Sequence, residues 1–346
     1  MGHWRRYVYL LVNNFNRATY PLRRINASSL FSSSNNNNTS MMKPEEARLP
    51  NPFISFTPPL SNYGNGILNF FSLFGRGKNK SLIAGADQQG FTFLYDLDQH
   101  HAIHKQVLLN EPKIYSTISV AAGDALYVQD KRPRPGSFEA LRYEVPKDLS
   151  PSRDWRWYCL QPPPYVLAPG YTPSTAISAY AVVNDTEIWT STPGFGTYSF
   201  DTVRGSWRKS GNWELPFRGR ADYFPEYGLW LGFSSRDGML CSSDLRAATK
   251  QSGPQLLHKD WKDVQAQEGW ILMESFLVHL GYGKFCVARF FQTVDRGSSE
   301  ELCQIESFVV LTGLTLQQCG ANGELRMIRH RSQLYYFQAM THCWAF

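Results

Sequence analysis

Short apolar runs separated by turn residues dominate the chain from Ile67 onward. The runs span roughly four to eight residues, and Gly, Pro, Asn and Asp stand between them, which is typical of β-strands. Before them, residues Tyr7–Asn13 and Thr19–Ile25 predict two strands joined by a turn at residues 14–18. One stretch departs from the pattern: Lys259–Gln267, around Trp261, suits a short helix. The pattern as a whole predicts an all-β fold.

A loose repeat runs through the same region. Its clearest copy has an aromatic residue, an acid, a turn and a tryptophan, from Phe200-Asp201 to Trp207. The C-terminus repeats this spacing from Phe337-Gln338 to Trp344, and looser copies start with Tyr95, Tyr143, Ser243 and Phe291. Propeller blades repeat every 40–50 residues or so, and a repeated tryptophan can pack between blades. We therefore predict a kelch-like β-propeller of six blades. A large β-sandwich or two smaller β domains is the alternative, since the chain lacks the Gly-Gly pair of ordinary kelch blades.

The two N-terminal strands offer a way to close such a propeller. We expect the hairpin Tyr7–Ile25 to complete the last blade by pairing with Leu325–Phe337, because closure removes exposed edge strands. The predicted divisions are the hairpin at 1–26, a disordered Ser/Asn-rich loop at 27–49 and the propeller body at 50–346. The hairpin and the body form one domain.

Charge and hydropathy restrict the kinds of partner and the cellular compartment that we expect for this protein. The chain of 346 residues has a net charge of +6, and residues 1–50 hold seven basic and two acidic side chains, so the body is nearly balanced. This balance argues against a nucleic-acid partner. No segment reaches the roughly 20 apolar residues of a membrane helix. Five arginines and no acid in the first 44 residues resemble a transit peptide, the alternative to the cytoplasmic or nuclear location that we expect.

The cysteines favour a reducing compartment. None of the six forms C-x-x-C, and their number is too small for a disulfide scaffold in a chain of this length. We expect Cys159, Cys286 and Cys303 to be buried thiols, since their neighbours are apolar.

The sequence contains few residue patterns that could support catalysis or metal binding. The group Asp96, Asp98, His100, His101 and His104 has metal-ligand residue types, but a strand end followed by a turn explains it equally, and the sequence leaves this open. No G-x-S-x-G motif occurs, and the neighbours His342 and Cys343 are interpreted as structural. We interpret Pro162–Pro164 as a crossing between blades. The sequence thus assigns no catalytic, cofactor-binding or metal residue.

Several segments together resemble one family. They include Arg5-Arg6-Tyr7-Val8, Tyr20–Ile25, Gly196–Trp207, Gly228–Phe233 and Leu325–His330, and others cover most of the chain between them. On these segments the chain resembles the grass-plant proteins classified as domain of unknown function 1668. The resemblance implies a kelch-type propeller that includes residues 5–25. It carries over no activity and no catalytic residue.

These observations favour a monomeric, non-enzymatic β-propeller scaffold without a cofactor. It would bind an unidentified protein partner through loops, which can vary on a rigid framework. The alternative is a propeller-type enzyme with a metal or a central-channel acid/base site, since the fold alone does not decide. A weaker alternative is attachment to a membrane surface or nucleic acid through the basic N-terminus.

Overall fold

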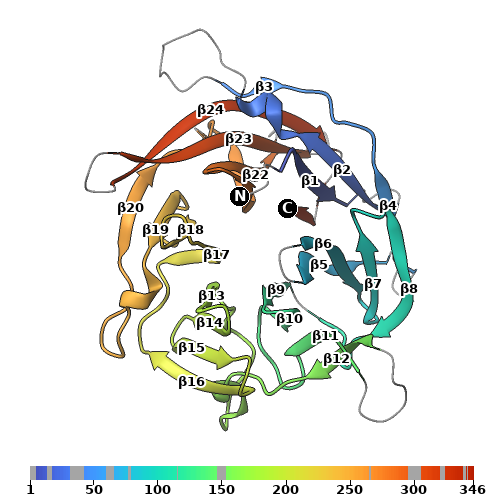
Figure 1. Cartoon of the computed structure of the whole chain (residues 1–346), viewed down its shortest axis with the longest axis vertical. Coiled ribbons are helices and arrows are strands. Elements are labelled where there is room, and N and C mark those ends of the chain that lie inside the picture. The colour runs from blue at the N-terminus through green and yellow to red at the C-terminus, as the bar shows by residue number, and fades with distance from the viewer. Residues whose placement is uncertain are drawn as a thin grey trace, which may run out of the picture. The chain divides into compact units, whose positions relative to one another are not determined.

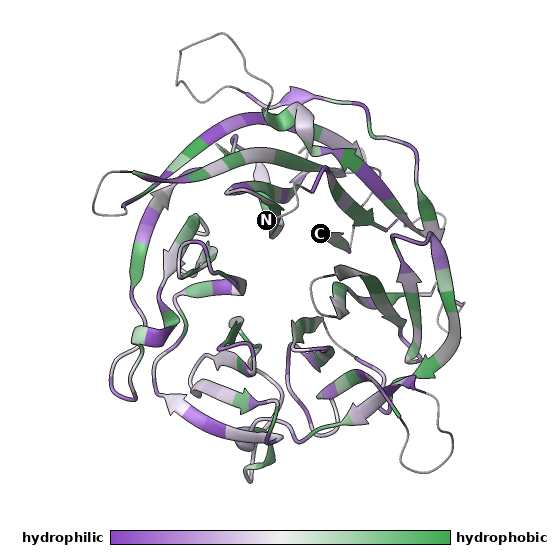
Figure 2. Cartoon of the chain, viewed as in Figure 1, coloured by the Kyte–Doolittle hydropathy of each residue, from purple (hydrophilic) through white to green (hydrophobic). Residues whose placement is uncertain are grey.

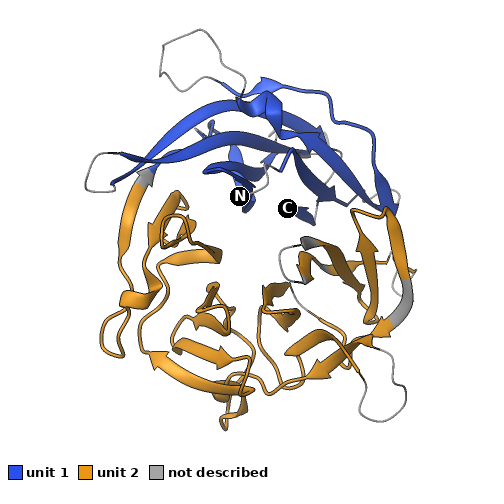
Figure 3. Cartoon of the chain, in the orientation of Figure 1, with its two compact units in different colours: residues 1–58, 261–346 blue, residues 59–260 orange. Residues whose placement is uncertain are grey.

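A computed structural model describes residues 5–13, 18–31, 43–59, 66–76, 79–114, 116–145, 153–264, 266–294, 305–319, 324–337, 340 and 342–346. In these ranges the chain forms strands and three short 3-10 helices, η2 (Ala27–Phe31), η3 (Pro164–Leu167) and η4 (Leu245–Ala247), and no α-helix. The all-β prediction is confirmed. None of the described helices is long and apolar enough to cross a membrane. The chain divides into two compact units, residues 1–58 with 261–346 (unit 1) and residues 59–260 (unit 2) (Figure 3).

Unit 2 consists of successive four-stranded antiparallel meanders (Figure 1). The first contains β5 (Leu68–Arg76), β6 (Asn79–Asp87), β7 (Phe91–Asp96) and β8 (His101–Leu108). The second contains β9 (Thr117–Ala122), β10 (Ala125–Asp130), β11 (Glu139–Glu144) and β12 (Asp154–Cys159). The third contains β13 (Ala179–Val183), β14 (Glu187–Thr192), β15 (Gly196–Asp201) and β16 (Ser206–Gly211). The fourth contains β17 (Phe217–Phe224), β18 (Leu229–Ser234), β19 (Leu240–Ser243) and β20 (Leu256–Trp261). Parallel pairing of β13 with β17 joins the last two meanders into one eight-stranded sheet.

Apolar clusters join each meander of unit 2 to the next. One cluster connects the first and second meanders, another the second and third, and a third the third and fourth. A tryptophan hydrogen bond accompanies each cluster: Trp157 donates to the Thr92 hydroxyl at 2.8 Å, Trp207 to the Gln161 carbonyl at 2.7 Å and Trp230 to the Val182 carbonyl at 2.8 Å. Tryptophan suits this position because its large ring buries much apolar area while its N–H still finds an acceptor.

The repeat predicted from the sequence has a structural counterpart in unit 2. Tyr95, Tyr143, Phe200 and Ser243 each lie at the carboxyl end of the third strand of a meander, in β7, β11, β15 and β19. In three of the four meanders an aspartate that follows accepts backbone N–H groups in the next turn. Side-chain caps of this kind are local, so the same letters recur at the same place.

The remaining repeat positions and the predicted helix are wrong. Phe291 lies near the end of a second strand and Phe337 ends a fourth strand. The third strand of their sheet ends in Gln317-Gln318-Cys319, without an aromatic residue that could mark it. At Lys259–Gln267, strand β20 continues to the buried Trp261, and the described residues that follow it are not helical.

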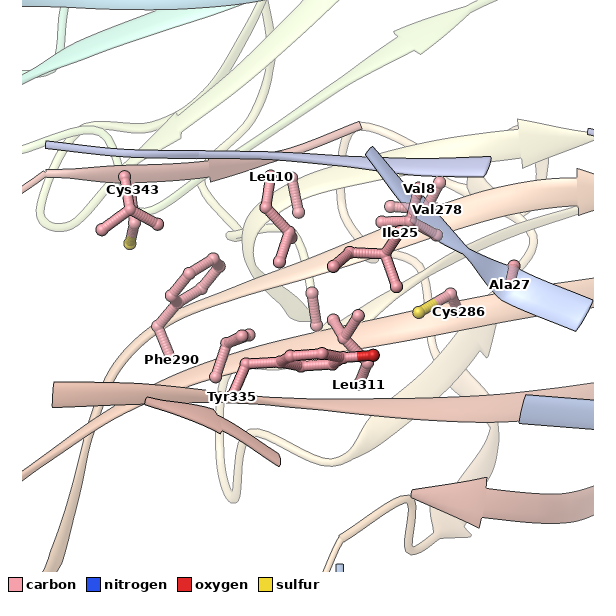
Figure 4. Packing of buried hydrophobic residues seen from close by; sticks show 14 of the residues in the cluster. Val8, Leu10, Ile25, Ala27, Val278, Cys286, Phe290, Leu311, Tyr335 and Cys343 are labelled. Atoms are coloured by element: carbon pink, nitrogen blue, oxygen red, sulfur yellow. The ribbon is translucent and has the colours of Figure 1, made fainter. Parts of the chain in front are cut away.

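Unit 1 contains two sheets. One has the order β25-β1-β2-β4 and contains β25 (Cys343–Ala345), β1 (Tyr7–Val12), β2 (Tyr20–Asn26) and β4 (Ile54–Phe56). The other has the order β21-β22-β23-β24-β3 and contains β21 (Trp270–Gly281), β22 (Lys284–Val294), β23 (Ile305–Cys319), β24 (Glu324–Phe337) and β3 (Glu45–Glu46). Val8, Leu10 and Ile25 from the first sheet meet Phe290, Leu311 and Tyr335 from the second in one apolar cluster (Figure 4).

The hairpin forms as predicted, but its partner differs. Strand β1 pairs with β25 and strand β2 with β4, whereas Leu325–Phe337 pairs with β23 and β3. Because β3 occupies the free edge of β24, that edge is closed to the hairpin. The predicted loop at 27–49 is shorter than expected at both ends, since Leu30 of η2 is fully buried and Glu45–Glu46 form β3. Residues 32–42 lie outside the described residues.

Unit 1 also carries a group that should make its stability depend on pH. The His330 ring packs on Phe31 at 5.0 Å between ring centroids, and its Nε2 lies 2.7 Å from the Thr315 hydroxyl. Burial, with a smaller effect from Lys284, lowers the pKa of His330. The unfolded chain therefore takes up this proton at a higher pH than the folded chain does. Stability is retained above the ordinary histidine pKa of about 6.5 and falls as the pH drops below it.

We expect the urea midpoint of the wild type to fall between about pH 7.5 and about pH 5.5. His330→Gln, which can still bond Thr315, should show a smaller fall. Equal falls in the two proteins would show that His330 does not contribute.

Candidate functional site

The aspartate–histidine group that the sequence left open spans the end of β7, the turn after it and the start of β8. Asp96 ends β7, and its Oδ1 accepts the backbone N–H groups of Asp98 at 2.8 Å and Gln99 at 3.0 Å. His100 occupies the left-handed region with φ 55°, and His101 begins β8. Among the described residues no group of three His, Cys, Asp or Glu side chains could hold a metal, and the His104 side chain is not described.

The other candidates from the sequence also occupy positions that a structural role explains. His342 stacks on Trp344, with 6.2 Å between ring centroids, while Cys343 is buried in the core of unit 1 (Figure 4). Burial raises the pKa of the Cys343 thiol well above its ordinary value, which disfavours a nucleophilic thiolate. Pro162–Pro164 lie in the connection from β12 to β13, as predicted, with Pro162 and Pro163 buried.

The cysteine predictions have mixed outcomes. Cys286 is buried as predicted, but Cys159 is exposed, because it ends the outer strand of its meander. Cys303 lies outside the described residues.

A buried ion pair holds the connection between β8 and β9. Lys113 Nζ lies 2.6 Å from Glu139 Oε1, and both side chains are 0% exposed. The ammonium also donates to the Glu111 carbonyl at 2.9 Å. Glu139 Oε2 accepts from the backbone and side-chain nitrogens of Asn110, at 2.8 and 2.6 Å. Because these groups face one another inside the fold, they secure a loop rather than form a reaction site.

A hollow of about 420 Å³ in unit 2 offers a better candidate for binding. It lies beside the third meander and is bordered by the connection from β19 to β20. Strand alternation puts Glu187 and Trp189 of β14 on one face of the sheet. Arg208 of β16 lies on that face too, because Trp189 is opposite Ser199 and Ser199 is opposite Arg208. Ser210 lies at a β-bulge of β16 and also lines the hollow. We call this hollow the β16 groove; hydrophilic colour marks much of β16 in Figure 2.

An ion pair fixes one wall of the β16 groove. Arg208 Nη2 donates to both carboxylate oxygens of Glu187, at 2.9 and 2.8 Å. The Trp189 indole N–H donates to the same carboxylate at 2.9 Å. Glu187 therefore neutralises Arg208 locally, and the wall keeps its shape.

Arg246 and Lys250 border the hollow from the segment around η4. Arg246 donates from Nε to Asp244 at 2.9 Å and from Nη2 to the Gly228 carbonyl at 2.7 Å, and these bonds hold its guanidinium in place. Lys250 follows η4, is exposed, and has no ion pair with any described residue. Its charge is thus available to an acidic ligand.

Two tryptophans and a hydroxyl form the floor. Trp213 packs against Trp189 with 5.8 Å between ring centroids, and its N–H donates to the Thr249 carbonyl at 2.7 Å. A side chain at Gly253 would come within 2.9 Å of Trp213, so glycine is needed there for the close approach. Ser210 is only 7% exposed, and its hydroxyl has no hydrogen-bond partner among the described residues. A buried hydroxyl without a partner is unfavourable, which favours a bound polar atom at this point.

The sequence analysis did not find this groove. Its residues come from five segments between Val183 and Lys250. The nearest local signals are the polar-aromatic pair Glu187 and Trp189 two positions apart and a serine, Ser210, in a strand that otherwise looks exposed. Neither signal is specific before the pairing of β14, β15 and β16 is known.

A comparison of the sequence with known protein families finds one that matches. A family model described as "Protein of unknown function (DUF1668)" matches residues 5–336. No curated protein matches the sequence. Among solved structures, the chain is similar to the Cps50 (Swd1) β-propeller domain of Myceliophteria thermophila, at 10% identity, 95% and 97% coverage of the two chains and a TM-score of 0.42. It is also similar to the RRP9 WD40 repeats, at 9% identity, 80% and 84% coverage and a TM-score of 0.37. For BamB from Moraxella catarrhalis the identity is 11%, the coverage 75% and 76%, and the TM-score 0.31.

Proposed function

Because the chain belongs to the DUF1668 family of proteins of unknown function, which supplies no activity to transfer, we propose a function from its own geometry. The protein is a non-enzymatic scaffold that binds another protein, and the partner places an extended segment in the β16 groove. The observation that carries this proposal is the groove itself, with its apolar floor, its unpaired lysine and its unpartnered buried hydroxyl.

The framework we propose is a closed, kelch-like propeller of six blades. Four meanders in unit 2, the meander β21–β24 and the sheet β25-β1-β2-β4 supply six four-stranded groups in the described residues. In this proposal the sheet made from both chain ends is the last blade, and hydrogen bonds from β1 to β25 close it. A rigid framework of this kind keeps the groove preorganised, which lowers the entropy lost on binding.

The groove fits a segment with an acidic side chain beside an apolar one. A carboxylate would meet Lys250 on the rim and the Ser210 hydroxyl below it, while an apolar side chain would lie on Trp189 and Trp213. Tryptophan rings are frequent binding anchors. The five described cysteines are free, which supports a reducing compartment, the cytoplasm or nucleus, as part of the proposal. The proposal also states that the protein comes from a grass plant and is a monomer.

The test is quantitative affinity capture from an extract of the native cells. Lys250→Glu should weaken retention of the captured partner about tenfold, since loss of one charge-assisted hydrogen bond is worth about 1.5 kcal/mol. Ser210→Val should weaken it as well, because valine fills the space and offers no hydroxyl. The matched control is Lys209→Glu, which makes the same charge change at an exposed neighbour on the opposite face of β16. Equal retention by all variants would refute the groove as the docking site.

A further inference from the structure

Arginines and aromatic rings alternate on the N-terminal hairpin of unit 1. The Arg24 guanidinium lies over the Tyr7 ring at 4.4 Å and over the Phe53 ring at 5.4 Å. Arg6 lies over the Tyr7 ring at 5.6 Å, and Arg5 over the Tyr9 ring at 5.3 Å. We call these six residues the arginine ladder.

Strand pairing explains why the ladder forms. Val8 and Leu10 of β1 point into the apolar core, so the alternate residues Tyr7 and Tyr9 point to the other face. Register puts Tyr9 opposite Arg24 across β1 and β2, which brings the arginine of one strand to the tyrosines of the other. In Figure 2 part of β2 has the hydrophilic colour.

The ladder carries charge without a balancing acid. Among the described residues, no carboxylate forms an ion pair with Arg5, Arg6 or Arg24, and the side-chain contacts of these arginines are with aromatic rings. Arg6 and Arg24 are exposed, and Tyr7, Tyr9 and Phe53 are half-exposed. Stacking on a ring holds a guanidinium in place and leaves its N–H groups free, because the ring contacts the face of the group and not its edge.

We propose that the arginine ladder binds the backbone of single-stranded nucleic acid. Guanidinium edges match phosphate oxygens in a two-pronged fork, and half-exposed rings beside them suit the bases of an unpaired strand. An acidic peptide would use the charges but leave the rings without a role. Charge counting from the sequence argued against nucleic acid because residues 51–346 are nearly balanced. The structure instead places three of the N-terminal arginines, Arg5, Arg6 and Arg24, over aromatic rings of unit 1.

The proposal is independent of the β16 groove, which lies in the other unit. The test measures fluorescence anisotropy of labelled oligo(U) and oligo(dT) of about 12 nucleotides with the full chain, between about 50 and 200 mM salt. Two phosphate contacts, made by the exposed Arg6 and Arg24, predict a log–log slope of about −1.4, since each contact on a single strand contributes about −0.7. Arg6→Gln with Arg24→Gln should make the slope less negative by about 1.4 and reduce affinity at low salt.

Matched variants distinguish the effect of losing a charge from the effect of losing the folded structure. Arg218→Gln, an exposed arginine in unit 2, removes the same kind of charge and should leave the slope unchanged. Arg6→Lys with Arg24→Lys keeps the charge and should retain the slope while weakening affinity a few-fold, so a result is obtained even where the glutamine variant does not fold. The proposal is overturned by a lack of binding at the lowest salt, by equal slopes for the wild type and the glutamine variant, or by stronger binding to polyglutamate or to phosphatidylserine vesicles than to either oligonucleotide.

Discussion

Lys113→Met should lower the free energy of unfolding by about 3–5 kcal/mol, the range found when one partner of a buried ion pair is removed. Glu139 would keep its negative charge at a position that is 0% exposed, with no cation to balance it. The Glu111 carbonyl would lose its ammonium donor as well. Burial lowers the pKa of Lys113, and its neighbour Glu139 opposes that shift. Urea unfolding followed by tryptophan fluorescence measures the change.

A double variant tests this explanation. Glu139→Gln removes the charge and keeps one carbonyl oxygen, which at the Oε2 position can still accept from the Asn110 N–H. We therefore expect Lys113→Met with Glu139→Gln to be more stable than Lys113→Met alone. If the double variant is less stable by the sum of the two single changes, the stranded charge is not the cause.

Leu10→Ala should lower the free energy of unfolding by about 2–5 kcal/mol, as leucine truncations in closely packed cores do. Leu10 is 0% exposed and lies between the two sheets of unit 1 (Figure 4). Its removal leaves a cavity that the long strands β22 and β23 cannot easily fill. Deletion of residues 1–25 is the extreme case and should lower the melting temperature sharply. Thermal and urea unfolding of both variants provide the measurement.

The matched control is Ile271→Ala, on β21 of the same unit. Ile271 is 52% exposed, so its truncation should change stability by less than about 0.5 kcal/mol. Similar losses for Leu10→Ala and Ile271→Ala, or an unchanged melting temperature after deletion of the hairpin, would mean that the hairpin does not form part of the core.

Local signals made the architecture of unit 2 predictable. Asp96 and Asp201 each cap the turn after an aromatic residue, and this needs only neighbouring residues, so the sequence showed where one strand of each repeat ends. The pairing of Leu10 with Ala345 joins residues from opposite ends of the chain, and nothing local at either end specifies it. For the same reason the hairpin was predicted correctly but was given the wrong partner strand.

The candidate site was harder to predict because its chemistry depends on remote neighbours. The Asp96–His104 group looked reactive by composition, yet its first carboxylate is used by backbone N–H groups. Ser210 and Lys250 looked ordinary, and they become notable only because β16 and the segment after η4 border the same hollow. Clusters along a sequence therefore predicted turns, whereas the groove follows from strand register.

Site-specific photocrosslinking tests the central claim most directly. A photoreactive amino acid replaces Thr249, which is exposed and lines the β16 groove, or Val203, which is 79% exposed in the turn between β15 and β16. Irradiation in native extract should yield a covalent adduct with one protein from position 249 and none from position 203. Lys250→Glu should reduce the yield of that adduct. No adduct at 249, or the same adducts at both positions, would contradict a scaffold that binds its partner in the groove.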